Sequence, residues 1–451
     1  MFNENSIKLK ISLMSDMHVS GSWFIEGSMN KMKKAFEYTK EVAGKYPEIY
    51  LFNGDFVDCI NSRDNVIYWP EEDGSKYPKD YETAYKIQTA KEFENWRELF
   101  ALLPESSDII YCLGNHDSDN NNNNPRFIKE FASKYEVGDN LNFERMYRTD
   151  TDIEGLKTGM RHCVSHGYHF FALDMYSDMQ KSLEFLKKGL DEVTAAEPDK
   201  YVFVLWHCKV PNTVFCDHGW GSSKELGELL KNYPQVLLIT GHTHCPLQNE
   251  RSIMQNAFTT VEASCVDYIV EASVLDHEER EKPLNFLHNE AYMLSHGLLL
   301  EIDNEDNIRI TRLDYAHGEI IKQPWILPHP AADLSHLTHY TARRAALYPA
   351  PEFPCGTQIE LVPDEKGTKI KFRQAQHPDM PFLYAVKITL KSGEEIIHRL
   401  TSRFLMYATP SKENLPDIEA VLPIDFESVK SVTVTPQDIW YQSGKSIVME
   451  L

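Results

Sequence analysis

Short apolar runs alternate with segments of helical periodicity through the first half of the chain. The apolar runs predict strands near residues 7–16, 48–55, 108–117, 168–174, 201–207 and 236–242. The periodic segments predict helices near 28–46, 80–103, 125–135, 178–193 and 223–232. Alternation of strands and helices is typical of sheets flanked by helices. We therefore expect the first part of the chain to have an α/β fold.

The second half of the chain has a different pattern. From about residue 258 the helical periodicity fades, and strands are expected near 257–266, 297–303 and 308–315. Six prolines between residues 322 and 356 predict a linker. Beyond it, apolar runs separated by turn residues predict only strands, as in a small β-sandwich. The expected domains are an α/β domain at 1–322, a proline-rich linker at 323–355 and a β-sandwich domain at 356–451.

Composition excludes some classes of protein. A formal net charge of −22 argues against a basic surface for nucleic acid or for an anionic membrane, so we expect neither partner. The N-terminal segment lacks the basic and apolar regions of a secretory signal, and no run approaches the roughly 20 apolar residues that span a bilayer. The 8 cysteines are scattered without a C-x-x-C pair, as reduced thiols are. We expect a soluble cytoplasmic protein and leave its oligomeric state open.

Most of the apolar runs in the first half end in carboxylate, amide or imidazole residues. These residues are Asp16, His18, Asp55, Asp58, Asn115, His116, Asp117, His207, His242 and His244. Ligands bind at the carboxyl ends of strands in open α/β sheets, so we expect these side chains to meet. Each has an ordinary explanation as a turn, cap or core residue, but turn chemistry does not explain why histidine recurs at these strand ends. Their oxygen and nitrogen donors suit Mn, Fe or Zn, and they offer too many candidate ligands for one ion, as a site for two ions would.

The series D-x-H, G-D-x-x-D, G-N-H-D, H and G-H-x-H resembles the motifs of the calcineurin-like metallophosphoesterases, over roughly residues 8–320. The resemblance implies a four-layer α-β-β-α sandwich of two mixed sheets, with a two-metal site at the strand ends. It further implies that one metal ion is held by Asp16, His18, Asp55 and His244. The second ion would be held by Asn115, His207 and His242, with Asp55 bridging the two.

The resemblance also implies a mechanism. A hydroxide that bridges the two ions attacks the phosphorus atom, and the ions screen the negative charge of the phosphate. His116 is expected to be catalytic without binding metal, and Asp58 is expected to orient it. His242 and His244 are expected to serve different ions, because neighbouring side chains diverge along an extended segment.

Departures from two subfamilies narrow the substrate. The stretch GDFVDCI lacks the Arg-Gly of the protein serine/threonine phosphatases, and Asp58 stands where purple acid phosphatases have a tyrosine ligand. The motifs are more similar to those of bacterial phosphodiesterase-type members, which include cyclic-nucleotide phosphodiesterases. The expected activity is therefore hydrolysis of a small phosphodiester. The alternatives are a phosphomonoesterase or nucleotide pyrophosphohydrolase that uses the same site, and a scaffold protein whose site is vestigial.

Several further residues have weaker claims to a function. Two cysteines that follow proposed ligands are expected to be buried thiols, and three nearby histidines are expected to be solvated or part of the core. These residues are Cys208, Cys245, His162, His166 and His169. The loops at 120–124 and 215–223 are candidates for substrate contact, although ordinary loops would have the same composition. The C-terminal domain is expected to pack against the first domain without binding metal.

Overall fold

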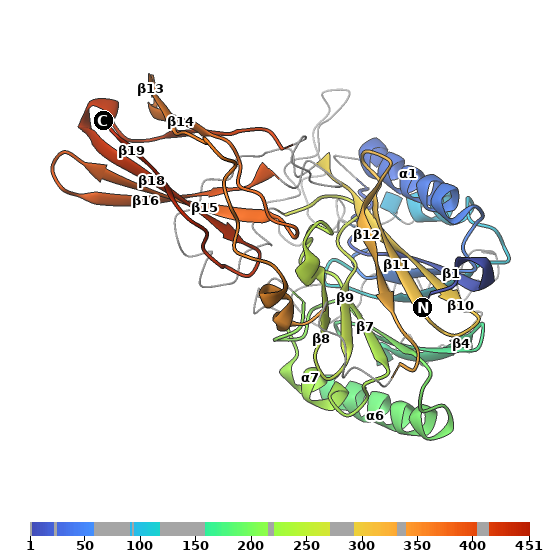
Figure 1. Ribbon diagram of the computed structural model, residues 1–451. Coiled ribbons are helices and arrows are strands. Elements are labelled where there is room, and N and C mark those ends of the chain that lie inside the picture. Colours follow the sequence, from blue (N-terminus) through green and yellow to red (C-terminus); the bar gives the residue numbers. More distant parts are fainter. Residues whose placement is uncertain are drawn as a thin grey trace, which may run out of the picture.

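The computed structural model describes residues 2–21, 25–57, 91–92, 94–117, 158–214, 221–270, 293–331, 340–403 and 415–451. Two six-stranded mixed sheets and their flanking helices form the first part of the molecule, and smaller antiparallel sheets form the second part (Figure 1). The helix expected near 125–135 lies outside the described residues. Of the segment near 80–103, residues 91–92 and 94–100 are described and helical.

The first sheet has the strand order β12-β11-β10-β1-β2-β3. Neighbouring strands are parallel from β1 to β3 and antiparallel from β1 to β12. The N-terminal strand is therefore central, between β2 and β10. The strands are β1 (Ile7–Met14), β2 (Ile49–Asn53), β3 (Asp108–Cys112), β10 (His296–Asp303), β11 (Ile308–Asp314) and β12 (Glu319–Leu327).

The second sheet has the order β4-β5-β6-β7-β9-β8. Its four central strands are parallel, and antiparallel strands close both edges. The carboxyl ends of the parallel strands therefore share one edge of the sheet. The strands are β4 (Met160–Ser165), β5 (Tyr168–Leu173), β6 (Val202–Trp206), β7 (Val236–Thr240), β8 (Ile253–Gln255) and β9 (Thr259–Glu262).

Both faces of each sheet are buried, which explains the continuous apolar runs in the sequence. In β2, Ile49 and Leu51 pack in the core between the two sheets, while Tyr50 and Phe52 pack in a second core with helix α1 (Ile25–Ala43). In the second sheet, the residues of β6 divide in the same way between the shared core and a third core beneath helices α6 (Met179–Ala196) and α7 (Lys224–Leu230). The layers are helix, sheet, sheet and helix, so the predicted four-layer α/β fold is confirmed.

The helices begin where the sequence provides a cap and an amphipathic pattern. Asp178 caps α6, because its side chain accepts a hydrogen bond from the Lys181 N–H at 3.1 Å. In α6, Leu186, Leu190 and Val193 recur at helical spacing on the buried face. Among the residues that the structure describes, no helix combines the length and the apolar character needed to cross a membrane.

Strands β4, β8 and β12 were not expected from the sequence. β12 contains Pro324, which cannot donate a hydrogen bond to a neighbouring strand. The strand tolerates this proline because it lies at the edge of the first sheet. Residues 323–327, expected in the linker, therefore belong to the sheet, and residues 342–347 of the same expected linker form a 3₁₀ helix.

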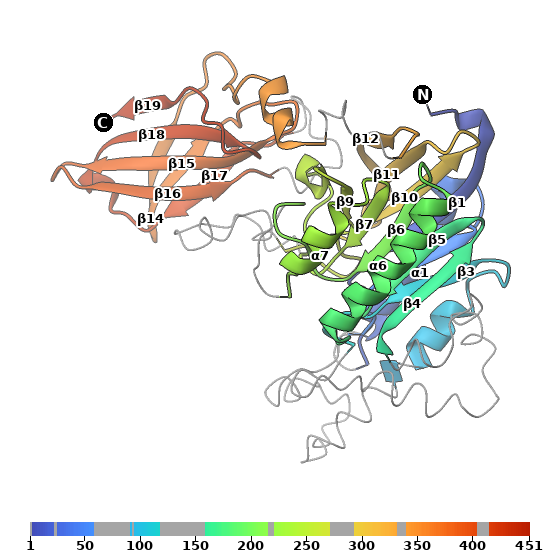
Figure 2. The same ribbon diagram turned by 90° about the horizontal axis from the view of Figure 1, so that it is seen from below.

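The C-terminal region contains two antiparallel sheets, with the orders β13-β14-β17 and β16-β15-β18-β19. They pack face to face around an apolar core that includes Ile370 and Phe372 from one sheet and Val386 and Val434 from the other. Figure 2 shows the two sheets beside the larger unit. The strands are β13 (Glu360–Asp364), β14 (Gly367–Phe372), β15 (Pro381–Leu390), β16 (Glu395–Thr401), β17 (Ile418–Leu422), β18 (Val429–Asp438) and β19 (Ile447–Glu450).

A buried ion pair joins the two large sheets close to the carboxyl end of β3. Asp174, which follows β5, accepts hydrogen bonds from the Leu113 N–H at 2.7 Å, from Arg161 Nη1 at 2.6 Å and from the Tyr176 hydroxyl at 2.9 Å. Arg161 also donates to the backbone oxygen of Tyr111 at 3.0 Å. These contacts fix the chain just before the G-N-H-D motif.

Substitution of Asp174 by alanine is expected to lower the free energy of unfolding by about 3–5 kcal/mol, because Arg161 would keep its charge in a buried site without a partner. Urea unfolding measures the change. Asp191→Ala is the control, since Asp191 pairs with Lys187 on the exposed side of α6 and exposed pairs contribute little. Equal losses in the two variants would contradict a structural role for the buried pair.

Candidate metal centre

Five strands of the two large sheets end close to one another. β1, β2 and β3 contribute from the first sheet, and β6 and β7 contribute from the second. Each strand is followed within a few residues by polar side chains, namely Asp16, His18, Asp55, Asn115, His116, His207, His242 and His244. Most of these side chains are buried, whereas His116 and His242 are half-buried. The half-buried imidazoles therefore mark the accessible side of the cluster.

Three overlapping groups of residues have donor atoms that all lie within 4.8 Å of one another. The groups are His18, Asp55 and His116; Asp55, His207 and His242; and His18, His244 and Cys265. Asp55 is common to the first two groups, and His18 is common to the first and third. Asn115 is buried beside His116, whose backbone N–H donates to Asp55 Oδ1 at 2.8 Å. The groups therefore form one continuous cluster around Asp55.

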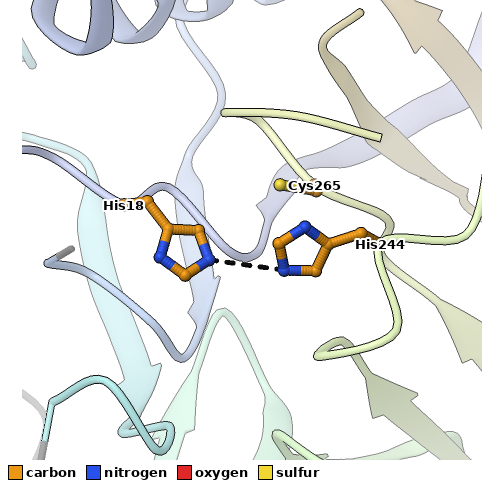
Figure 3. A group of neighbouring side chains, drawn as sticks. All are labelled: His18, His244 and Cys265. Carbon is orange, nitrogen blue, oxygen red and sulfur yellow. Dashed lines mark hydrogen bonds between the residues drawn. The ribbon is translucent and has the colours of Figure 1, made fainter. Parts of the chain in front are cut away.

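The spacing of the donor atoms suits metal binding. His207 Nε2 lies 3.2 Å from Asp55 Oδ2, and His244 Nε2 lies 2.9 Å from Asp16 Oδ1. His18 Nε2 lies 3.3 Å from His244 Nε2 (Figure 3). Two donor atoms that each sit about 2.1 Å from one ion, at an angle of about 90–110°, are about 3.0–3.4 Å apart. Two of the observed spacings lie in that range and the third is 0.1 Å below it, so these residues fit divalent ions.

Hydrogen bonds orient two of the histidines. His207 Nδ1 lies 2.7 Å from the backbone oxygen of Asn53, and His244 Nδ1 lies 3.0 Å from the backbone oxygen of Tyr268. Because a carbonyl oxygen only accepts hydrogen bonds, each Nδ1 must carry the proton. In the neutral ring, Nε2 then presents a lone pair towards Asp55 or Asp16, which is the arrangement found for histidine ligands of metals.

Several buried polar atoms of the cluster have no hydrogen-bond partner, and two of them face the other donor atoms. These two are Asp16 Oδ1 and His207 Nε2. The contact between Asp16 Oδ1 and His244 Nε2 is short but lacks hydrogen-bond geometry. Because buried polar atoms are nearly always satisfied in proteins, such a pair of atoms needs an explanation. A bound cation would satisfy both, so the fit to metal rests on these atoms as well as on the distances.

The backbone of the cluster is left-handed at five non-glycine residues. The φ angles are 52° at Asp16, 43° at His18, 54° at Asp55, 68° at His242 and 52° at His244. The expectation that His242 and His244 lie on an extended segment was therefore wrong. Non-glycine residues in this conformation are uncommon and concentrate at functional sites, where the surrounding structure holds them. The bends turn successive side chains towards the cluster.

The family assignment follows from a comparison with known protein families. The model of the calcineurin-like phosphoesterase family matches residues 9–246, which is 238 of the 451 residues. The chain belongs to the calcineurin-like phosphoesterase family. No match to the chain was found among curated proteins. The matched range contains every residue predicted to bind metal, and the family assignment and the donor groups together support a metal-dependent hydrolase of phosphoester bonds.

Close packing explains two glycines of the phosphoesterase motifs. Gly54 has a φ of 89°, and a β-carbon there would lie 2.4 Å from His207 Nδ1. A β-carbon at Gly114 would lie 2.2 Å from Asp55 Oδ1. Real β-carbons do not approach other atoms so closely, so any side chain at these positions would displace Asp55 or His207. The glycines are therefore part of the site although they offer no donor side chain.

Asp117 supports the phosphoesterase site in a way that the sequence did not reveal. Its Oδ1 accepts hydrogen bonds from the N–H groups of Phe56 at 2.8 Å and Val57 at 3.3 Å, and its Oδ2 accepts one from Gly114 at 2.9 Å. The carboxylate thus joins the loop after β2 to the loop after β3. Burial and the nearby charge of Asp55 raise its pKa well above the usual value. The sign of it in the sequence is the last residue of G-N-H-D, which by itself does not indicate a structural role.

Two residues beyond the matched range also contact the donor groups of the phosphoesterase. Cys265 belongs to the third donor group, and the ring of Tyr268 lies with its centroid 4.3 Å from that of His244. Sequence reasoning missed both, because no motif marks the segment after β9. Cys208 and Cys245 are buried, as predicted.

The other residues singled out in the sequence lie away from the metal cluster or outside the residues that the structure describes. His162 stacks on Phe171 in the region covered by α6, and its Nε2 lies 2.9 Å from His169 Nδ1. His166 is exposed in the turn between β4 and β5, so the expectation of core or solvated roles is confirmed. Asp58, the loop at 120–124 and residues 215–220 lie outside the described residues.

The charges of buried acids and histidines in the phosphoesterase site depend on one another. Burial opposes ionisation of Asp55, but His207, His116 and His18 outweigh it and hold the pKa of Asp55 well below its usual value. Burial likewise opposes protonation of His207, but Asp55 and Asp16 outweigh it and raise the pKa of His207 to about 10. At neutral pH the metal-free site therefore holds a proton on His207 that a metal ion must displace.

Metal uptake by the metal-free phosphoesterase near pH 7 is expected to release protons. Ligands bind in their deprotonated form, and the raised pKa of His207 keeps its ring protonated beforehand. Isothermal titration of the protein with Mn²⁺ at one pH, in two buffers of different ionisation enthalpy, measures the number of protons released. Affinity should rise with pH between neutrality and about pH 10. Identical heats in the two buffers would contradict the expectation.

Proposed function

We propose that this phosphoesterase hydrolyses a small phosphodiester with two divalent metal ions. The observation that carries the proposal is that Asp55 belongs to two donor groups at once, as a ligand shared by two ions must. Mn, Fe and Zn are the candidates, because the cluster offers oxygen and imidazole ligands. One ion would be held by Asp16, His18, Asp55 and His244, and the other by Asp55, Asn115, His207 and His242.

The two ions would lower the pKa of a shared water and reduce the negative charge that repels a nucleophile from phosphate. The chain's own residues set up this chemistry. Asp16 and Asp55 supply negative charge in a buried site, which compensates the charge of the ions. The carbonyl oxygens of Asn53 and Tyr268 fix the rings of His207 and His244 so that each Nε2 faces the acids.

His116 is proposed to act on the leaving group. Its ring is half-buried and meets the ring of His18 edge to face, with the centroids 4.5 Å apart. Its backbone N–H is fixed by Asp55 Oδ1, so the ring is held beside the cluster on its accessible side. From there an imidazolium can stabilise the developing charge or protonate the leaving oxygen. Asp58 is proposed to orient His116, as in the resemblance that the sequence shows.

Support for a diester substrate comes from the motifs. The chain lacks the Arg-Gly that follows the second aspartate in protein phosphatases and has G-N-H-D in place of G-N-H-E. In the structure the aspartate of G-N-H-D, Asp117, is buried and accepts hydrogen bonds from backbone N–H groups. Cyclic nucleotides are candidate substrates within this class. A cytoplasmic location likewise remains a prediction from the sequence.

Comparison of two chromogenic substrates tests the proposal. Mn-loaded protein is expected to hydrolyse bis-p-nitrophenyl phosphate with a kcat/KM at least about tenfold above that for p-nitrophenyl phosphate, a difference of about 1.4 kcal/mol in transition-state stabilisation. The opposite order would indicate a phosphomonoesterase. Preference for a nucleoside diphosphate derivative over both would indicate a pyrophosphohydrolase. A protein that binds no metal and hydrolyses none of these compounds would be a scaffold.

A panel of cyclic nucleotides then addresses the substrate. Each compound is incubated with wild-type protein and with Asp55→Asn protein purified in the same way. Hydrolysis by the variant as well as the wild type would reveal a contaminating phosphatase. A product formed by the wild type alone identifies a substrate of this site.

A further inference from the structure

The segment at residues 265–270 is bonded to the loop that carries Asp16. Cys265 Sγ donates to the backbone oxygen of Asp16 at 3.0 Å and accepts a hydrogen bond from the Tyr268 N–H at 3.1 Å. The Val266 N–H donates to the backbone oxygen of Ser15 at 3.1 Å. This segment, here called the support segment, follows β9 and lies beyond the end of the family match at residue 246.

The support segment also holds His244. The backbone oxygen of Tyr268 accepts the Nδ1 proton of His244 at 3.0 Å, and the Val270 N–H donates to the backbone oxygen of His244 at 3.2 Å. The Tyr268 ring packs on the ring of His244 and lies 5.5 Å from that of His18. Figure 3 shows Cys265 beside His244, with the Nε2 of His244 directed at His18. The segment therefore sets the position and the tautomer of one proposed ligand.

The C-terminal sheets cover the support segment. One buried apolar cluster combines residues from around the metal centre with residues of the C-terminal unit, and Tyr268, Trp440 and Tyr441 pack against it. Its members are Cys245, Cys265, Ile269, Leu294, Met380, Phe382, Leu383 and Ile439. Every member is almost fully buried. The expectation that the C-terminal unit packs against the first unit is confirmed, and the contact lies directly behind His244.

Polar contacts fasten the same interface. Arg251 donates to the backbone oxygen of Ile439 at 3.1 Å, and its guanidinium lies over the Trp440 ring. Arg344 binds both carboxylate oxygens of Asp379 at 2.7 and 2.6 Å. Arg251 thus holds the residue after β18 against the larger unit, and Arg344, from the 3₁₀ helix at 342–347, holds Asp379 just before β15. The C-terminal unit is therefore fixed in place at the point where it meets the support segment.

We propose that the C-terminal unit is a positioning element of the metal centre, acting through the support segment on His244 and Asp16. The inference rests on the metal-dependent activity proposed above. The proposal predicts that loss of the interface between the two units lowers the affinity for one metal ion and not for both. His207 is oriented by Asn53 and packs against Gly54, both at the end of β2, so the support segment does not contribute to these contacts. Loss of the interface should weaken binding of the ion at His244 and leave binding of the ion at His207 unchanged.

Two phenylalanines of the C-terminal unit make a matched test. Phe382 belongs to the apolar cluster at the interface, whereas Phe372 belongs to the core between the two C-terminal sheets. Both are fully buried, so alanine at either position removes the same side chain from a packed site. Titration of metal-free protein with Mn²⁺ measures the dissociation constant of each ion. Loss of an outer contact of a metal ligand typically weakens binding about 10–100-fold.

Phe382→Ala is expected to raise the dissociation constant of one ion about 10–100-fold and to leave that of the other ion within about twofold. Phe372→Ala is expected to leave both dissociation constants unchanged. If the alanine variants do not fold, Ile439→Val and Ile370→Val form the same comparison with a smaller change. Unchanged affinities in Phe382→Ala, or equal losses in the two variants, would overturn the inference. Wild-type protein that binds no ions and hydrolyses no phosphoester would overturn the proposed function as well.

Discussion

Asp55→Asn protein is expected to bind both metal ions poorly and to lose turnover. Asp55 belongs to two donor groups, and its Oδ2 lies 3.2 Å from His207 Nε2 and 3.8 Å from His18 Nε2. The amide offers one oxygen and no charge, so it cannot replace a shared carboxylate. The loss of affinity should exceed about 100-fold, because even contacts outside the ligand shell are worth about 10–100-fold.

Metal content per chain, measured by mass spectrometry after desalting, and hydrolysis of bis-p-nitrophenyl phosphate check this prediction. Asp314→Asn is the control, because Asp314 is a buried carboxylate that binds His317 and lies outside the donor groups. The control should keep its ions and its activity. About two ions per chain with full activity in Asp55→Asn would show that Asp55 is not shared by the ions.

His116→Ala protein is expected to keep both ions and to lose about 10²–10³-fold in kcat, or roughly 3–4 kcal/mol. The ring is proposed to act on the leaving group from the accessible side of the cluster. The loss should be smaller for substrates with good leaving groups such as p-nitrophenolate, which need little protonation. Asp58→Asn should give a milder form of the same defect, since it changes only the orientation and charge of His116.

Kinetics with a good and a poor leaving group, together with metal content, distinguish the roles of His116. His398→Ala, in β16 of the C-terminal unit, should change neither quantity. The structure makes the experiment decisive, because a ring nitrogen of His116 lies within 4.8 Å of the donor atoms of His18 and Asp55. Loss of an ion from His116→Ala would make His116 a ligand. Full activity on a poor leaving group would exclude the acid role.

The strands that carry the site could be predicted because the sequence marks where each of them ends. In β2 and β7, a run of apolar residues stops at glycine and is followed at once by Asp55 or His242. Parallel neighbours then bring these ends to the same edge of the sheet. The hairpins of the C-terminal unit were visible for a similar reason, because Gly393 lies between β15 and β16, Gly367 directly follows the turn between β13 and β14, and both have positive φ angles.

Two of the strands that were not expected from the sequence, β12 and β4, were missed for identifiable reasons. β12 contains Pro324, which argues against a strand unless its edge position is known. In β4, Arg161 occupies a buried position at which the alternation of apolar and polar residues in a strand requires an apolar residue. Its ion pair with Asp174 makes the buried charge tolerable. Both exceptions depend on neighbours that are distant in sequence.

The shape of the metal centre was less predictable than its composition. Positive φ angles are uncommon at any residue other than glycine, and although aspartate and histidine adopt them more often than most, the sequence does not mark Asp16 or His244 among its many Asp and His residues. The role of the support segment depends on contacts between Cys265 and Asp16, which are 249 residues apart. Contacts of this range leave no periodic signal in one sequence.

The central position of β1 has a consequence for synthesis of the chain. β1 ends at Met14, and its partner β10 begins 282 residues later, at His296. At about 5–20 residues per second, a ribosome needs roughly 15–60 s to make that stretch. Until then one edge of β1 has unpaired backbone groups next to apolar residues such as Ile11 and Leu13, a combination that favours aggregation. Nascent chains of fewer than about 300 residues are therefore the species that most need a chaperone.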